Sequence, residues 1–160
     1  MEKLHKLIQT LQASPQKVKL LQEINSQLLS RFRLKITEGI FLYPLEVEAY
    51  YNDGDQFEDS SCHCHALQYD RFGKLYFHRL GATDTIDKNR GGTDLCLSTR
   101  NGLCYSILIR SAKINDQVII GPHRVAKKIL NQPPTPHSEL APFFTANGSD
   151  RAKMPEDTGS

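Results

Sequence analysis

Apolar residues recur at helical spacing along the first 31 residues of the chain. Two such stripes are separated by Ser14-Pro15, a pair that predicts an N-cap followed by proline at the first helical position. A stripe along one side of a helix is typical of packing against a core. The pattern therefore predicts two amphipathic helices, the first with Leu4, Leu7, Ile8 and Leu11 as its stripe and the second with Val18, Leu21, Ile24, Leu28 and Leu29.

From Phe32 onward the apolar residues recur at every second position, which is the period of a strand. A turn at Glu38-Gly39 separates two such runs, and this arrangement predicts a β-hairpin. In the second run the apolar residues alternate with Glu46, Glu48 and Tyr50. Successive side chains of a strand point to opposite faces, so the two carboxylates and the tyrosine share one face.

Further strands and one helix are predicted after residue 73. The strands cover residues 75–79, 93–98 and 103–110, and Asn101-Gly102 is a strong hairpin signal between the last two. Gly121-Pro122 then begins a helix. The polar stretches 52–73 and 81–92 have no sustained period and are expected to be loops. We therefore expect an α+β fold: one mainly antiparallel sheet with N-terminal helices and a C-terminal helix.

The composition changes after residue 130, where the chain holds five of its eight prolines. We expect a single domain over residues 1–130, with its N-terminal helices in residues 1–31, and a largely flexible tail over residues 131–160. No apolar run approaches the roughly 20 residues that cross a bilayer, and the first residues lack the apolar stretch of a secretory signal. The expected protein is cytoplasmic, monomeric and not bound to membranes.

A formal net charge of +2 permits a polyanionic partner without requiring one. The four cysteines are too few for a disulfide scaffold, so free thiols are the simpler expectation. Cys62-His63-Cys64-His65 contains residue types that bind zinc, but neighbouring residues of an extended strand do not converge on one ion. We expect no metal and no cofactor. A metal-dependent hydrolase stays open as an alternative, because Cys96 and Cys104 could complete a site after folding.

Glu48 is a candidate general base, because a carboxylate on a cleft-facing strand can take a proton from water. The competing interpretation places Glu46 and Glu48 on the solvated face of an edge strand, and the pattern alone favours it. Arg110 ends an apolar strand, and its partner could be a carboxylate or a phosphate. His123 and Arg124 lie where the last helix begins, which suits phosphate contacts as well as ordinary solvation.

Taken in order, several short motifs resemble the methylpurine-DNA glycosylase (3-methyladenine DNA glycosylase) family. The resemblance covers about residues 25 to 130, and it depends on the order and spacing of the motifs, because no single motif is specific. The matching segments are Glu46-Val47-Glu48-Ala49-Tyr50, Asp59-Ser60-Ser61-Cys62-His63, Gly73-Lys74-Leu75-Tyr76, Leu108-Ile109-Arg110 and Gly121-Pro122.

The resemblance implies base-excision repair of double-stranded DNA that contains damaged bases. In such an enzyme a damaged purine is flipped out of the duplex, and a water activated by Glu48 cleaves its N-glycosidic bond. Arg110 would hold that water. The walls of the base pocket would be Tyr50, His63, His78 and Tyr76.

The resemblance also implies how DNA would be held. Leu80 corresponds to the side chain that fills the gap in the duplex, and an apolar wedge of this kind unstacks bases. Arg79 beside it, together with His123 and Arg124, would contact the DNA.

Four parts of the chain depart from the family pattern. The segment after His63 differs, and the small loop at the hairpin tip is replaced by the longer stretch Ala82 to Arg90. The family's asparagine that excludes normal guanine has Cys96 or Asp94 as its nearest counterpart, and the region beyond the last helix is short and rich in proline. These departures keep a second hypothesis open, namely a module of the same fold that binds nucleic acid or a nucleotide without cleaving it.

Overall fold

The computed structural model of the chain describes residues 2–37, 39–52, 72–81, 83, 85–98, 103–131 and 143–144. Within these residues it contains one sheet and three helices, which are α1 (Glu2–Ala13), α2 (Lys17–Arg31) and α3 (Pro122–Leu130). No helix in this part of the chain is long and apolar enough to span a membrane. The α+β class expected from the sequence is therefore confirmed.

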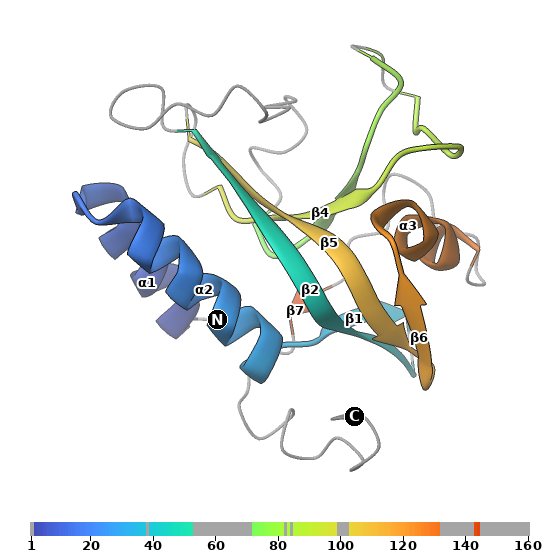
Figure 1. The fold of residues 1–160 in the computed structure, drawn as a ribbon, viewed down its shortest axis with the longest axis horizontal. Coiled ribbons are helices and arrows are strands. Elements are labelled where there is room, and N and C mark those ends of the chain that lie inside the picture. Colours follow the sequence, from blue (N-terminus) through green and yellow to red (C-terminus); the bar gives the residue numbers. More distant parts are fainter. Residues whose placement is uncertain are drawn as a thin grey trace.

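The sheet has seven strands in the order β3-β4-β5-β2-β1-β7, with β6 paired to β5 beyond the end of β4. All of their pairings are antiparallel. The long strands β2 and β5 form the twisted centre of the sheet (Figure 1). In chain order the strands are β1 (Leu34–Thr37), β2 (Ile40–Asn52), β3 (Leu75–Phe77), β4 (Thr93–Cys96), β5 (Cys104–Ile114), β6 (Gln117–Ile120) and β7 (Phe143–Phe144).

Helices α1 and α2 cover one face of the sheet (Figure 1). Tyr51 of β2 and Tyr105 of β5 point to this face, where both are buried and their rings meet edge to face with centroids 5.3 Å apart. Lys17 at the start of α2 lies over the Tyr51 ring, with its Nζ 5.6 Å from the centroid. This face is the main core, so residues that alternate with Tyr51 and Tyr105 must point to the other side.

The start of α2 differs from the expectation. The helix begins at Lys17 with Gln16 at the N-cap, and no side chain caps it. The hydroxyl of Ser14 instead accepts a hydrogen bond from the Gln16 amide at 3.0 Å, within the turn itself. The predicted Ser14 cap is therefore wrong, because a short local hydrogen bond of serine competes with capping.

Strand β6 was not predicted. Asn115 and Asp116 both have positive φ values, 50° and 62°, and join β5 to β6 as a two-residue hairpin turn. Asparagine and aspartate adopt this conformation more readily than most residues. The turn brings the chain back along β5, so that α3 begins beside the sheet and packs against β4, β5 and β6.

Two other features were not predicted from the sequence. Phe143–Phe144, inside the stretch expected to be flexible, pair with β1 at the edge of the sheet. Cys104 is disulfide-bonded, whereas Cys96 is buried and takes part in no disulfide. The expectation of free thiols is therefore wrong for Cys104, because spacing along the sequence does not reveal which cysteines meet after folding.

Candidate functional site

The face of the sheet opposite α1 and α2 carries a row of four residues, one from each of four neighbouring strands. Tyr76 lies opposite Asp94, Asp94 opposite Leu108, and Leu108 opposite Glu48. Directly opposed residues of antiparallel strands point to the same side. A second row, one step along, brings Tyr50 opposite Ser106. We call this surface the polar face.

Glu48 is held by two hydrogen bonds on the polar face. Arg110 Nη1 donates to Glu48 Oε2 at 2.7 Å, and the Tyr50 hydroxyl donates to Glu48 Oε1 at 3.0 Å. Arg110 Nε also lies 3.5 Å from Oε1 of Glu46. The Glu48 side chain is 43% exposed and that of Arg110 is 41% exposed. The carboxylate is therefore fixed in direction and still open to water.

A β-bulge explains why Arg110 reaches both carboxylates. Glu46 is opposite Ser111 and Val47 is opposite Ile109. Arg110 therefore has no directly opposed residue in β2 and is the extra residue of the bulge. A residue left over at a bulge bends its strand and changes the direction of nearby side chains. The bulge thus directs the Arg110 side chain toward the glutamates of β2.

This arrangement shifts two pKa values. Partial burial and the hydrogen bond to the charged Glu48 raise the pKa of Tyr50 to about 12. The hydrogen bond to Glu48 likewise raises the pKa of Arg110, which stays a cation. Tyr50 is therefore a neutral hydrogen-bond donor at physiological pH, and it presents an aromatic ring beside a carboxylate.

Asp94 forms a second cluster on the polar face. Its side chain is only 3% exposed, and His78 Nε2 lies 2.9 Å from Oδ1. The Ser106 hydroxyl donates to Oδ2 at 3.3 Å. The Gly92 amide donates to His78 Nδ1 at 3.2 Å, so the neutral ring carries its proton on Nε2 and donates it to Asp94.

Opposing effects act on the protonation of His78. Burial lowers its pKa, but the hydrogen bond and the charge of Asp94 outweigh burial, and the net pKa is raised. The Gly92 amide also opposes protonation, because Nδ1 accepts a hydrogen bond only in the neutral ring. The Asp94 carboxylate thus holds His78 in place and keeps its pKa above that of a free imidazole.

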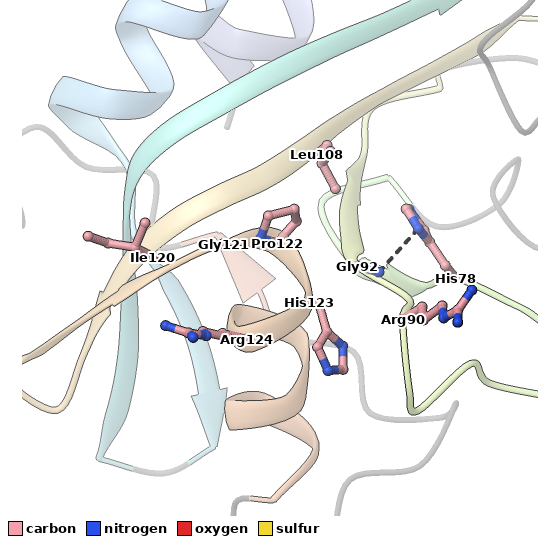
Figure 2. Close-up of a pocket in the computed structure, with 9 residues that line it drawn as sticks. All are labelled: His78, Arg90, Gly92, Leu108, Ile120, Gly121, Pro122, His123 and Arg124. Atoms are coloured by element: carbon pink, nitrogen blue, oxygen red, sulfur yellow. Dashed lines mark hydrogen bonds between the residues drawn. The ribbon is translucent and has the colours of Figure 1, made fainter.

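A pocket of about 390 Å³ lies beside Leu108, between the β3–β4 segment and the start of α3. Figure 2 shows His78, Arg90 and Gly92 on one side of it and residues 120–124 on the other. Leu108 is shared, because it lines the pocket and stands opposite Glu48 in the sheet. The pocket is therefore next to Glu48 and the two residues that hold it, Arg110 and Tyr50.

The other predicted site residues are placed as follows. Tyr76 is on the polar face but is 2% exposed, and the Arg79 guanidinium carbon lies 5.3 Å from its ring centroid. Arg79 itself is buried, whereas Leu80 is 48% exposed.

Both His63 and the Cys62 to His65 cluster lie outside the described residues. Within the described ranges, no group of three or more His, Cys, Asp or Glu side chains could hold a metal ion.

Ser106 and Arg90 were not predicted as site residues, and Asp94 was predicted only as a counterpart of the family's asparagine. The signal for Asp94 and Ser106 was present in the sequence, because Asp94 precedes Leu95 and Ser106 lies between Tyr105 and Ile107, so each polar side chain points to the face opposite its apolar neighbours. The hydrogen bond between Asp94 and His78 had no such signal, because it depends on how β4 and the segment after β3 meet.

Comparison with known proteins finds no family model that matches the chain, and neither a curated protein nor a solved structure that matches it significantly.

Proposed function

We propose that this protein hydrolyses the N-glycosidic bond of alkylated purines in double-stranded DNA, with Glu48 as the general base. The observation that carries the proposal is the Glu48 carboxylate, held at 2.7 Å by Arg110 and at 3.0 Å by Tyr50 on a surface open to water. A positioned carboxylate of this kind can orient a water molecule and accept its proton.

The reaction needs few groups. Water attacks the sugar carbon C1′ while Glu48 takes one of its protons, and the bond from C1′ to the purine nitrogen breaks with its electron pair going to the base. A purine made cationic by alkylation leaves as a neutral molecule. Acid assistance to the leaving group is therefore not required, which fits a site built around one fixed carboxylate.

The charges on the polar face suit a cationic base. Tyr50 lies within the electrostatic influence of both Glu48 and Asp94. An aromatic ring attracts a cation placed over its face by about 0.5 to 2 kcal/mol. The exposed Glu48 carboxylate and the aromatic ring of Tyr50 therefore favour an alkylated purine over its neutral counterpart.

The test compares the wild-type protein with Glu48→Gln on methylated duplex DNA, measuring released bases by chromatography. We expect release of 3-methyladenine or a related base, reduced roughly 10²- to 10⁴-fold in the variant, which is the usual effect of a general base. The matched control is Glu46→Gln, on the same strand and face but 60% exposed. It should release bases at close to the wild-type rate.

Two results would contradict the proposal. Equal rates for the wild type and Glu48→Gln would show that the base is another residue. Binding of damaged duplexes by the wild type with no release from any of them would indicate a binding module of the same fold, in which Glu48 only orders the surface.

A further inference from the structure

The pocket beside Leu108 is the surface from which more can be inferred. Because Leu108 lies directly opposite Glu48 on the neighbouring strand, a molecule that fills the pocket lies next to the proposed general base. Its volume of about 390 Å³ falls within the range of small-molecule sites. The pocket can hold a group of about the size of a nucleotide unit.

The lining of the pocket carries two cations, Arg90 and Arg124, together with the imidazoles of His78 and His123. No acidic residue is among the described residues that line it. Both arginines are exposed, and neither guanidinium forms a hydrogen bond or ion pair with any residue in the described part of the chain. Exposed arginines around an open pocket, with no ion pair to the described residues, are suited to an anionic ligand.

The floor of the pocket is apolar and depends on a glycine. Leu108 and Pro122 supply the apolar surface. A Cβ atom placed on Gly92 would lie 3.0 Å from Leu108 Cδ1 and 3.4 Å from Pro122 Cβ. A larger residue at position 92 would therefore narrow the pocket where its two walls meet.

The positions of the two arginines indicate what kind of anion fits. In Figure 2, Arg90 and Arg124 lie at opposite sides of the pocket, with Gly121, Pro122 and His123 between them. Two separated cations match successive phosphates of a strand better than a single small anion. The first turn of α3 between them adds the positive end of its dipole.

We propose that this pocket binds the backbone of one DNA strand, with phosphates at Arg90 and Arg124 and a sugar against Leu108 and Pro122. The identity of the ligand rests on the proposed function, since the adjacent Glu48 is the reason to expect DNA. The pocket then places the strand so that a nucleotide next to the bound backbone faces Glu48.

The experiment measures binding of a fluorescent duplex, a single strand and free deoxyadenosine monophosphate over a series of salt concentrations. Arg90→Ala and Arg124→Ala should each reduce the slope of log affinity against log salt by about 0.7 to 0.9, the value for one lost phosphate contact. At about 0.1 M salt this corresponds to roughly five- to tenfold weaker binding. Free deoxyadenosine monophosphate should compete poorly, since it engages only one of the two arginines.

Two further variants separate charge from shape. Lys19→Ala removes one exposed positive charge from α2, which lies on the other side of the sheet, and should keep the wild-type slope. Gly92→Ala narrows the pocket without changing the charge, so it should weaken binding at every salt concentration and leave the slope unchanged. Circular dichroism of each variant verifies that it is folded.

If both arginine variants keep the wild-type slope of log affinity against log salt, this inference is overturned. It is also overturned if free deoxyadenosine monophosphate competes as well as a DNA strand does. Wild-type base release by Arg90→Ala and Arg124→Ala would overturn it while the proposed function stands. Conversely, reduced slopes in a protein that releases no base would support the strand site and contradict the glycosylase proposal.

Discussion

Arg110 Nη1 lies 2.7 Å from Oε2 of Glu48, so an ion pair joins two residues that are 62 positions apart in the sequence. The contact crosses from β5 to β2 at a bulge, which gives the Arg110 side chain its direction. An ion pair with both side chains about 40% exposed adds little to stability. Its value lies in the orientation that it gives to the carboxylate.

Replacing Arg110 tests that orientation. Arg110→Ala should slow base release roughly tenfold to a hundredfold, because misplacement of a reacting group by about 1 Å has an effect of that order. Arg110→Lys keeps the positive charge but loses the planar guanidinium with its several N–H donors. Its rate of base release should therefore lie between those of the wild type and Arg110→Ala. Single-turnover kinetics measure the effect, and a wild-type rate in Arg110→Ala would mean that Glu48 is positioned without the arginine.

The pKa of Tyr50, about 12, should depend on Glu48. In Glu48→Gln the negative charge is removed and burial stays, so the pKa should fall toward 10 without reaching it. The folded state favours the neutral phenol, so this contribution to stability is complete below about pH 10 and is lost as the pH rises through 12. NMR titration of the Tyr50 ring measures the shift, and an unchanged value would contradict the hydrogen bond.

Asp94 should control the protonation of His78, whose pKa is raised in the folded protein. Asp94→Asn removes the charge, so the His78 pKa should fall below its wild-type value, as followed by NMR titration of the imidazole. The raised pKa means that the stabilisation from protonated His78 is complete below about pH 6.5 and is lost as the pH rises through the folded value.

The stability lost in Asp94→Asn should accordingly be larger at mildly acidic pH than at mildly alkaline pH. Denaturant unfolding at several pH values measures this difference. Ser106→Ala is the control, because it removes the other hydrogen bond to Asp94 without changing the charge beside His78. A pH-independent loss in Asp94→Asn would show that His78 does not titrate against Asp94.

Two isoleucines give a matched test of the core. Ile107 is fully buried in the main core, whereas Ile120 at the end of β6 is 69% exposed. Ile107→Ala should lower the free energy of unfolding by about 2 to 5 kcal/mol, because it removes apolar contacts and leaves a cavity. Ile120→Ala should change it by less than about 0.5 kcal/mol. Similar losses in both variants would contradict the orientation of β5 and β6.

Much of the local structure could be predicted from periodicity. Helical spacing identified α1 and α2, and alternation placed Glu48 and Tyr50 on one face, because that relation depends only on the period of a strand. Strand β6 was missed, since its four residues show no alternation and its turn signal, Asn115-Asp116, is short.

The sequence by itself determined which residues share a face within one element, and it limited the chemistry to a few polar side chains on those faces. Only the tertiary structure decided which faces meet. The bulge that directs Arg110 toward Glu48 and the approach of His78 to Asp94 both depend on strand pairing and register. These are properties of two strands together, and the period of one strand contains no information about its neighbour.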